Sequence, residues 1–210
     1  MKKKSIKMIA VLMAVLLLVF TIAPLDVSAA FDKSVRDGVV VVATYVVDTN
    51  DDIYAGGQGT GFFIGKLDEN PEYLITNHHV IKEWLNYGKG EKFVVDGYVL
   101  HASVRVYYSS DDYEEARVVD YDESADIAVL RLAEPTDKRK ALALHIPTDD
   151  NIGDPVYCVG FPGVSDNVWF ESTSKWGKQD ASVTTGTASR ILTLVGKGVK
   201  AIQTDAQINH

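Results

Sequence analysis

The 210-residue chain has little cysteine and an excess of acidic residues, and each property excludes a class of protein. Cys158 is the only cysteine, so no disulfide can form within the chain and its stability has to come from packing. Lysine and arginine number 21 against 29 acidic residues, a formal charge of −8, and no basic stripe could neutralise a phosphate backbone. We therefore expect no nucleic-acid partner. With 46% hydrophobic residues the composition is globular, which excludes a disordered chain.

Only one long hydrophobic run occurs, and it lies near the N-terminus. Four of the first seven residues are lysines, an apolar segment covers residues 8–23, and Pro24 and small residues up to Ala30 follow. This order is typical of a secretory signal peptide over residues 1–30. A permanent anchor is the weaker alternative, because the run is shorter than the ~20 residues that a membrane-crossing helix needs. We expect a secreted or cell-envelope protein. Contact with a membrane is expected only if the signal segment stays uncleaved.

From Val39 onward the pattern predicts an all-β protein. Short segments rich in Val, Ile, Tyr and Phe are separated by Gly, Asp and Asn every ~8–12 residues, which is the spacing of a sandwich or barrel. A polar stretch over residues 133–150 predicts an interdomain linker, and one helical turn or two is expected at Val80–Leu85. The predicted strands are Gly38–Val47, Gly59–Gly65, Tyr73–Thr76, Tyr98–Tyr108, Glu115–Asp120, Ile127–Leu132, Pro155–Gly160, Ser182–Leu194 with an interruption, and Val199–Thr204.

Two polar residues at strand ends are candidates for chemistry. His79 follows the predicted strand Tyr73–Thr76, where a side chain can be held at the edge of a cleft, and Asp126 precedes Ile127, where we expect the carboxylate to be drawn inward. Each also has a structural alternative, since histidines at strand ends are mostly structural and aspartates often cap turns. A metal site at His78 and His79 is disfavoured, because adjacent side chains on an extended chain point to opposite faces.

A glycine-rich segment, residues 56–65, invites comparison with phosphate-binding loops. No Gly-Lys-Ser/Thr follows, and the segment enters a predicted strand where a phosphate loop would open a helix. Phosphate binding is therefore excluded, and we interpret the glycines as permitting close backbone packing at the start of a strand.

Taken in chain order, four segments resemble the trypsin-like serine proteases, most closely the bacterial HtrA/Deg branch. They are Gly-Gln-Gly-Thr-Gly-Phe from Gly57, Leu-Ile-Thr-Asn-His-His-Val-Ile from Leu74, Asp-Ile-Ala-Val-Leu-Arg-Leu from Asp126 and Ile-Gln-Thr-Asp-Ala-Gln-Ile-Asn from Ile202. The resemblance implies that His79 is a general base and that Asp126 orients it. It also implies peptide-bond hydrolysis of protein or peptide substrates through an acyl-enzyme, without a cofactor or a required metal.

The third member of such a triad, the serine, is not identified in this chain. In the resembled family the last of the four segments continues into Gly-Asn-Ser-Gly-Gly, which places the nucleophile just beyond His210. The serines at positions 165, 172, 174, 182 and 189 lack the surrounding motif that exposes a hydroxyl beside N–H donors. We therefore expect an exported serine endopeptidase whose 210-residue chain is inactive by itself.

The predicted architecture is two antiparallel β-barrels. The first, residues 31–135, is a complete six-stranded barrel that carries His79 and Asp126, and the second, residues 136–210, is only partly present. Two alternatives stay open. One is a secreted, non-catalytic binding protein of the same fold. The other is a cysteine hydrolase using Cys158 with His79, although the apolar neighbours of Cys158 predict a buried, unreactive thiol.

Overall fold

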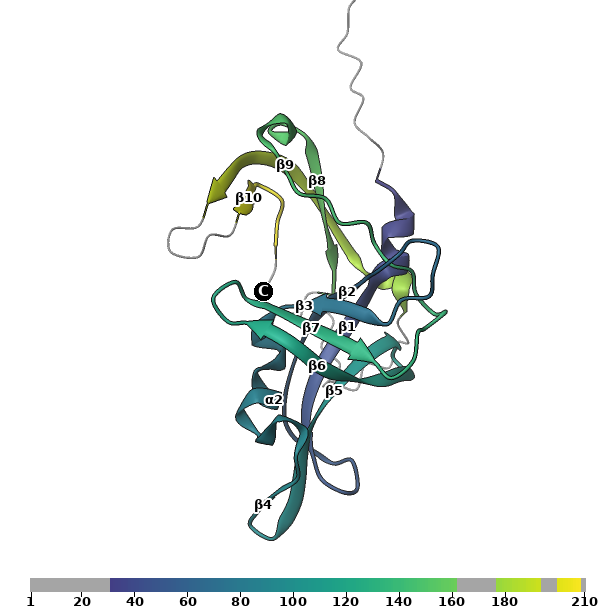
Figure 1. The fold of residues 1–210 in the computed structure, drawn as a ribbon, viewed down its shortest axis with the longest axis vertical. Helices are drawn as coiled ribbons and strands as arrows, with labels where there is room; N and C mark the ends of the chain where they lie inside the picture. The colour runs from purple at the N-terminus through teal and green to yellow at the C-terminus, as the bar shows by residue number, and fades with distance from the viewer. Residues whose placement is uncertain (1–30, 162–176, 194–199, 209–210) are drawn as a thin grey trace, which may run out of the picture. The chain divides into compact units, whose positions relative to one another are not determined.

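The computed structural model describes residues 31–161, 177–193 and 200–208, and antiparallel strands dominate it (Figure 1). The strands are β1 (Val39–Val47), β2 (Ile53–Ile64), β3 (Tyr73–Thr76), β4 (Phe93–Val95), β5 (Tyr98–Ser109), β6 (Asp112–Asp122), β7 (Ile127–Leu132), β8 (Pro155–Gly160), β9 (Ser182–Thr193) and β10 (Lys200–Thr204). The short helical segments are η1 (Lys33–Gly38), η2 (His78–Ile81), α2 (Lys82–Asn86), η3 (Gly88–Gly90), η4 (Asp149–Asn151) and η5 (Lys178–Asp180).

Six of the strands form a closed antiparallel barrel. β1 pairs with β2 on one side and with β5 on the other, so the order β1-β2-β3-β7-β6-β5 returns to β1. Phe63, Leu74 and Leu130 fill the interior, and the side chain of each is fully buried. β4 extends the sheet outward from β5 as a hairpin. The predicted complete six-stranded barrel is confirmed.

β1 is buried along its whole length because it has a partner on each face. Val40 and Val42 point into the barrel core, whereas Val39 and Val41 pack outside it against Phe161 and against Ala181. Because both faces of β1 are covered, its residues do not alternate between apolar and polar, and the strand begins with four consecutive valines. β1 therefore couples the barrel to the second part of the chain.

The second part is a three-stranded sheet with the order β10-β9-β8, so the prediction of a partial second barrel is also confirmed. β9 was expected to be interrupted, but it is continuous, and only its partner changes. Residues 182–187 pair with β8 and residues 188–193 with β10. At Gly186 an added Cβ would lie 2.2 Å from the backbone nitrogen of Ala206. Glycine therefore lets the chain after β10 cross β9 closely.

Three strands differ from the sequence prediction by more than one residue: β2, β4 and β6, which runs from Asp112 to Asp122 where Glu115–Asp120 was predicted. β2 begins at Ile53, six residues before the predicted start, since the glycines at positions 56, 57 and 59 pair with the long β1. β4 was not predicted at all. It exists because an Asp-Gly turn folds it back on β5. The predicted helical turn is found as η2 followed by α2, slightly longer than expected.

The predicted linker, residues 133–150, lies against the barrel. The Arg139 guanidinium is buried and donates to the carbonyls of Val39 (3.2 Å) and Tyr108 (2.5 Å), and the Leu142 N–H donates to the Phe63 carbonyl (2.9 Å). Residues 31–210 form one compact unit, and the predicted boundary at residue 135 stays a prediction. The predicted signal peptide lies outside the described residues. In the ranges that are described, every helix is too short or too polar to cross a membrane.

Candidate active site

The turn that carries His79 is fixed against the barrel wall. β3 ends at Thr76, whose buried hydroxyl donates to the Thr60 carbonyl of β2 (2.8 Å). An added Cβ on Gly59 would lie 2.5 Å from Cγ2 of Val80, the residue after His79. Only glycine at this point of β2 lets η2 lie so close, and this contact positions the imidazole.

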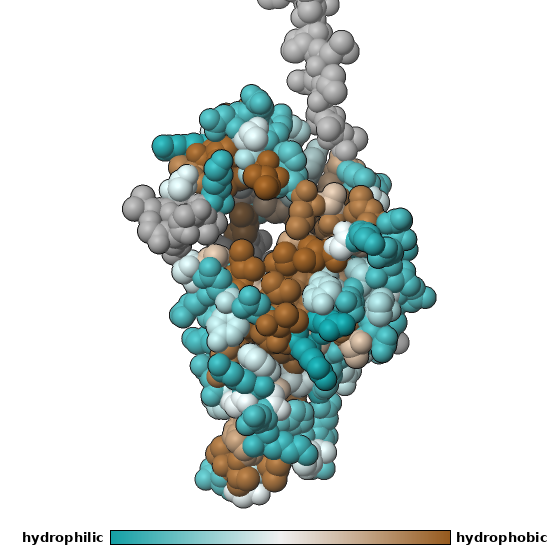
Figure 2. Space-filling view, viewed as in Figure 1, coloured by the Kyte–Doolittle hydropathy of each residue, from teal (hydrophilic) through white to brown (hydrophobic). Residues whose placement is uncertain are grey.

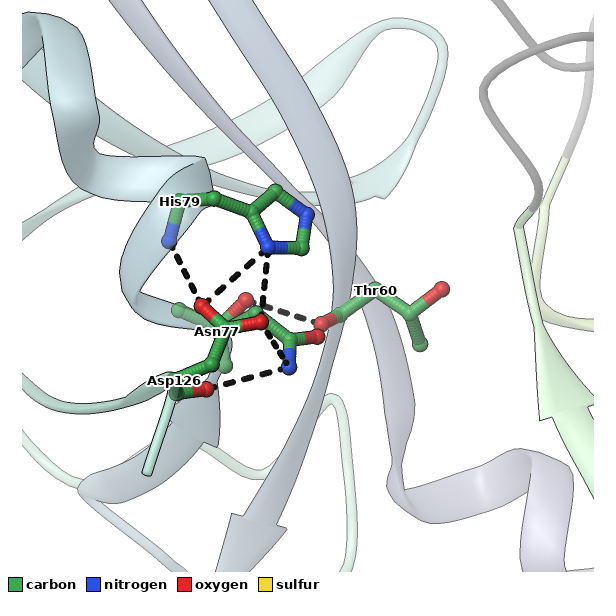
Figure 3. Close-up of polar contacts among 5 residues, drawn as sticks. Thr60, Asn77, His79 and Asp126 are labelled. Carbon is green, nitrogen blue, oxygen red and sulfur yellow. Dashed lines mark hydrogen bonds and ion pairs between the residues drawn. The ribbon is translucent and has the colours of Figure 1, made fainter. Parts of the chain in front are cut away.

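Asp126 is presented by a tight turn between β6 and β7. The Asp122 carboxylate accepts hydrogen bonds from the N–H groups of Ser124 (2.8 Å) and Ala125 (3.1 Å), which is a turn typical of aspartate. Asp126 itself has φ 55°, a left-handed conformation that aspartate adopts more readily than most residues. The turn directs its carboxylate toward η2 (Figure 3).

The structure brings His79 and Asp126 together, although they are far apart in the sequence. His79 Nδ1 lies 2.9 Å from Asp126 Oδ2 and 3.2 Å from Oδ1, and the backbone N–H of His79 donates to Oδ1 (2.9 Å), as Figure 3 shows. A carboxylate at Nδ1 favours the tautomer with the proton on that nitrogen. Nε2 is thereby left as the basic nitrogen, able to accept a proton.

Asn77 is a third member of the site that the sequence prediction did not single out. Its side-chain amide donates to the Asp126 carbonyl (3.1 Å) and to the Asp126 carboxylate (3.3 Å), so it ties the two turns together. The signal was its place two residues before His79 in the Thr-Asn-His-His segment.

Both members of the pair are open to solvent, and Asp126 is more open than the sequence suggested. The side chains of His79 and Asp126 are 61% and 45% exposed, whereas we expected the carboxylate to be drawn into the interior. Partial burial raises the pKa of Asp126, but the hydrogen bonds from the His79 backbone and ring, with the charges of His79 and His78, outweigh it. The net pKa of Asp126 is therefore lower than its ordinary value. The carboxylate is ionised at neutral pH, as an orienting group must be.

A cleft of about 500 Å³ lies between the barrel and the three-stranded sheet. Figure 2 shows this side of the molecule hollowed, with apolar surface in and around the hollow. The walls come from both parts of the chain. On the barrel side they are Gln58, Gly59, Thr60, Asn77, His79 and Asp126, and on the sheet side Cys158, Val159, Gly160, Phe161, Ser182, Thr184, Gln207 and Ile208.

Cys158 corrects a second expectation. The sequence predicted a buried thiol, but Cys158 is partly exposed and lines the same cleft as His79. The reason is that β8 belongs to a sheet of three strands, which does not enclose its side chains as the barrel does.

Two of the five serines considered lie in the described residues, where Ser182 lines the cleft and Ser189 is exposed on β9. Positions 165, 172 and 174 lie outside the described residues. Within residues 31–161, 177–193 and 200–208 the His79 ring has hydrogen-bond contact with Asp126 and with no serine. The same residues hold no group of three metal-binding side chains.

Comparisons with known proteins identify the family of the chain. Residues 59–210 match the trypsin-like peptidase domain. The chain is 31% identical over 166 residues to "Serine protease Do-like HtrA" of Lactococcus lactis subsp. cremoris (strain MG1363), which covers 76% of this chain and 34% of that protein. It is 26% identical over 154 residues to "Protease Do-like 1, chloroplastic" of Arabidopsis thaliana, covering 73% and 28%.

Among solved structures, the "Crystal structure of Deg5" aligns with a TM-score of 0.49 and 23% identity, over 80% of this chain and 68% of that one. The chain spans about a third of the length of these two curated relatives. The domain match covers well over half of the chain, which therefore belongs to the trypsin-like peptidase domain family.

Proposed function

We propose that this chain is part of an exported serine endopeptidase in which His79 is the general base and Asp126 orients it. The observation that carries the proposal is the contact of 2.9 Å between His79 Nδ1 and an Asp126 carboxylate that the His79 backbone also holds, at the wall of a cleft. Membership of the trypsin-like peptidase domain family supports it. The substrates we propose are protein or peptide chains.

The chemistry follows from the arrangement. His79 Nε2 takes the proton of a serine hydroxyl as the oxygen attacks the peptide carbonyl, and Asp126 stabilises the imidazolium that forms. The imidazolium then gives this proton to the departing amine, which leaves an acyl-enzyme. Water deprotonated by the same nitrogen releases the acid and restores the serine.

We propose that the nucleophilic serine follows His210 in a longer protein. The support is that Gln207 and Ile208 line the same cleft as His79. On this proposal the 210-residue chain by itself does not cleave peptides. Export is proposed from the basic, apolar and small-residue order of residues 1–30.

The decisive experiment compares variants of the longest form that the producing cell makes, identified by its intact mass. We expect His79→Ala and Asp126→Asn each to lower kcat/KM for an unfolded protein substrate by about 10⁴, with thermal unfolding nearly unchanged. Loss of the orienting carboxylate leaves the imidazole in the wrong tautomer, which is why the conservative asparagine is sufficient.

Cys158→Ser is the matched control, because Cys158 lines the same cleft. Its rate should stay within about twofold of the parent protein. If Cys158→Ser abolished hydrolysis and His79→Ala did so too, the enzyme would be a cysteine hydrolase. If the longest form neither hydrolyses the protein substrate nor reacts with a serine-directed fluorophosphonate, the alternative of a non-catalytic binding protein is favoured.

A further inference from the structure

The β4–β5 hairpin has an apolar tip that is exposed to solvent. Val94 is 68% exposed, Tyr98 54% and Val95 46%, although one side of the Tyr98 ring packs against Tyr54, with 5.8 Å between the ring centroids. Figure 1 places this hairpin at the lower end of the molecule, and Figure 2 shows a cluster of apolar surface there. Exposed apolar surface of this kind, away from the cleft, marks a site of interaction.

The outer edge of β4 offers backbone groups for pairing. In the described part of the chain β4 pairs with β5 alone, in the register Val95 with Tyr98 and Val94 with Val99. Asp96 and Gly97 have φ of 49° and 87°, so they form a two-residue turn of type I′ that is closed by a hydrogen bond between Val95 and Tyr98. Hydrogen-bonded and non-hydrogen-bonded pairs alternate along the ladder. The N–H and C=O of Val94 are therefore directed away from β5.

β4 is a short edge strand of three residues, but it lacks the other features that normally protect an edge. Its residues, Phe93–Val95, include no charge and no proline, and its register with β5 contains no bulge. The strand is instead flanked by a charge of each sign, Lys92 before it and Asp96 after it. In an antiparallel pair of two such strands, the positive end of one strand would lie beside the negative end of the other.

We propose that a second copy of this chain docks on β4 by antiparallel pairing, β4 to β4, around a two-fold axis through Val94. The two Val94 residues then exchange both N–H···O=C hydrogen bonds, and Phe93 of each copy lies opposite Val95 of the other. In the same register Lys92 of each copy lies opposite Asp96 of the other. The two hairpins become one four-stranded ribbon with a shared apolar face, an interface of the isologous type.

Charge identifies the partner as a second copy. The chain carries a formal charge of −8, so two copies repel one another over most of their surface. The hairpin segment from Lys89 to Gly97 is neutral, because Lys89 and Lys92 balance Glu91 and Asp96. Contact at β4 therefore brings the copies together at a neutral segment, where opposite charges meet. The proposal does not depend on peptidase activity.

The test is sedimentation equilibrium of the purified chain from ~1 µM to ~1 mM, the range in which small interfaces associate. We expect a monomer–dimer equilibrium. Lys92→Asp and Asp96→Lys each place like charges opposite one another twice in the dimer, and each should weaken dimerisation by about tenfold. The double variant, with both substitutions, restores complementarity, and its dissociation constant should return to within about threefold of the parent value. Lysine is compatible with the turn, since Lys89 already adopts φ 52°.

A second pair of variants tests the backbone contact. Val94→Pro removes the outward N–H without removing a hydrogen bond to β5 and should leave the chain monomeric over the whole range, whereas the matched control Val94→Thr should still dimerise. Circular dichroism reports whether each variant is folded, and if Val94→Pro is not, the charge exchange decides. A chain that stays monomeric up to ~1 mM overturns the proposal. The proposal also fails if the chain forms an oligomer whose dissociation constant does not change with these substitutions. It fails as well if β4 binds unrelated peptides and the chain does not self-associate.

Discussion

The barrel and the three-stranded sheet are built from similar strands, yet they bury very different side chains. The barrel closes on itself through the pairing of β1 with β5 and encloses large residues such as Phe63 and Leu130. Among the described residues of the sheet and its flanks, the buried apolar side chains are mostly alanines, such as Ala181, Ala188 and Ala206. Because hydrophobic stabilisation grows with the apolar area buried, the described barrel residues contribute more of it than the described residues of the sheet.

This difference determines how the site is built. His79 and Asp126 both lie on the rigid barrel and are held by backbone and side-chain hydrogen bonds, whereas the opposite wall of the cleft belongs to the sheet. Under the proposed function, the pair that needs accurate geometry lies on the barrel.

The largest expected effect comes from the barrel core. Leu130→Ala removes most of a fully buried side chain from the barrel interior and leaves a cavity. It should lower the free energy of unfolding by about 2–5 kcal/mol, as Leu→Ala changes in protein cores usually do. Ile202→Ala, on half-exposed Ile202 of β10, should lower it by less than about 0.5 kcal/mol. Urea denaturation measures both. Equal losses would mean that the sheet contributes as much as the barrel.

An effect of intermediate size concerns Tyr108, at the end of β5 in the barrel core. Burial raises the pKa of Tyr108 to about 12, and the nearby charge of Glu114 adds to the shift. The folded state favours the neutral phenol, so its contribution to stability is present below pH 10 and is lost as the pH rises through about 12. We expect a loss of up to about 2 kcal/mol over that interval.

Tyr108→Phe should flatten this part of the pH dependence, measured by denaturant unfolding between pH 9 and pH 12. The same change at the exposed Tyr121 of β6 is the matched control. An unchanged slope in Tyr108→Phe would mean that another group is responsible for alkaline unfolding.

The smallest expected effect lies at the junction of the two parts. The Thr60 hydroxyl of β2 accepts a hydrogen bond from the Phe161 N–H (2.8 Å) just after β8, and Gly160 packs directly against it. Thr60→Val keeps the shape but removes this acceptor, which should cost about 1 kcal/mol. Amide exchange at Phe161 should quicken while barrel amides such as that of Leu130 stay protected, whereas Thr60→Ser should behave as the parent does. Uniform quickening would show that the two parts open together.

Much of the fold could be predicted from local pattern. The bounds of β3, β7 and β8 agree with the sequence prediction, because each is a short apolar segment between turn residues. β4 and the first half of β2 could not be found in this way, since they are strands only by virtue of their partners β5 and β1. Propensity is a weak guide for strands whose residues, such as glycines, become extended only through pairing with a partner.

The same division applies to the site. The order of the motifs was sufficient to single out His79 and Asp126 and to indicate the family, because chemistry depends on residue types that sequence displays directly. Tertiary contact alone decided that Asn77 ties the two turns together, that Cys158 faces the cleft and that the pair is half open to solvent. Burial and hydrogen bonding arise between segments distant in the chain, and a one-dimensional pattern does not record which segments meet.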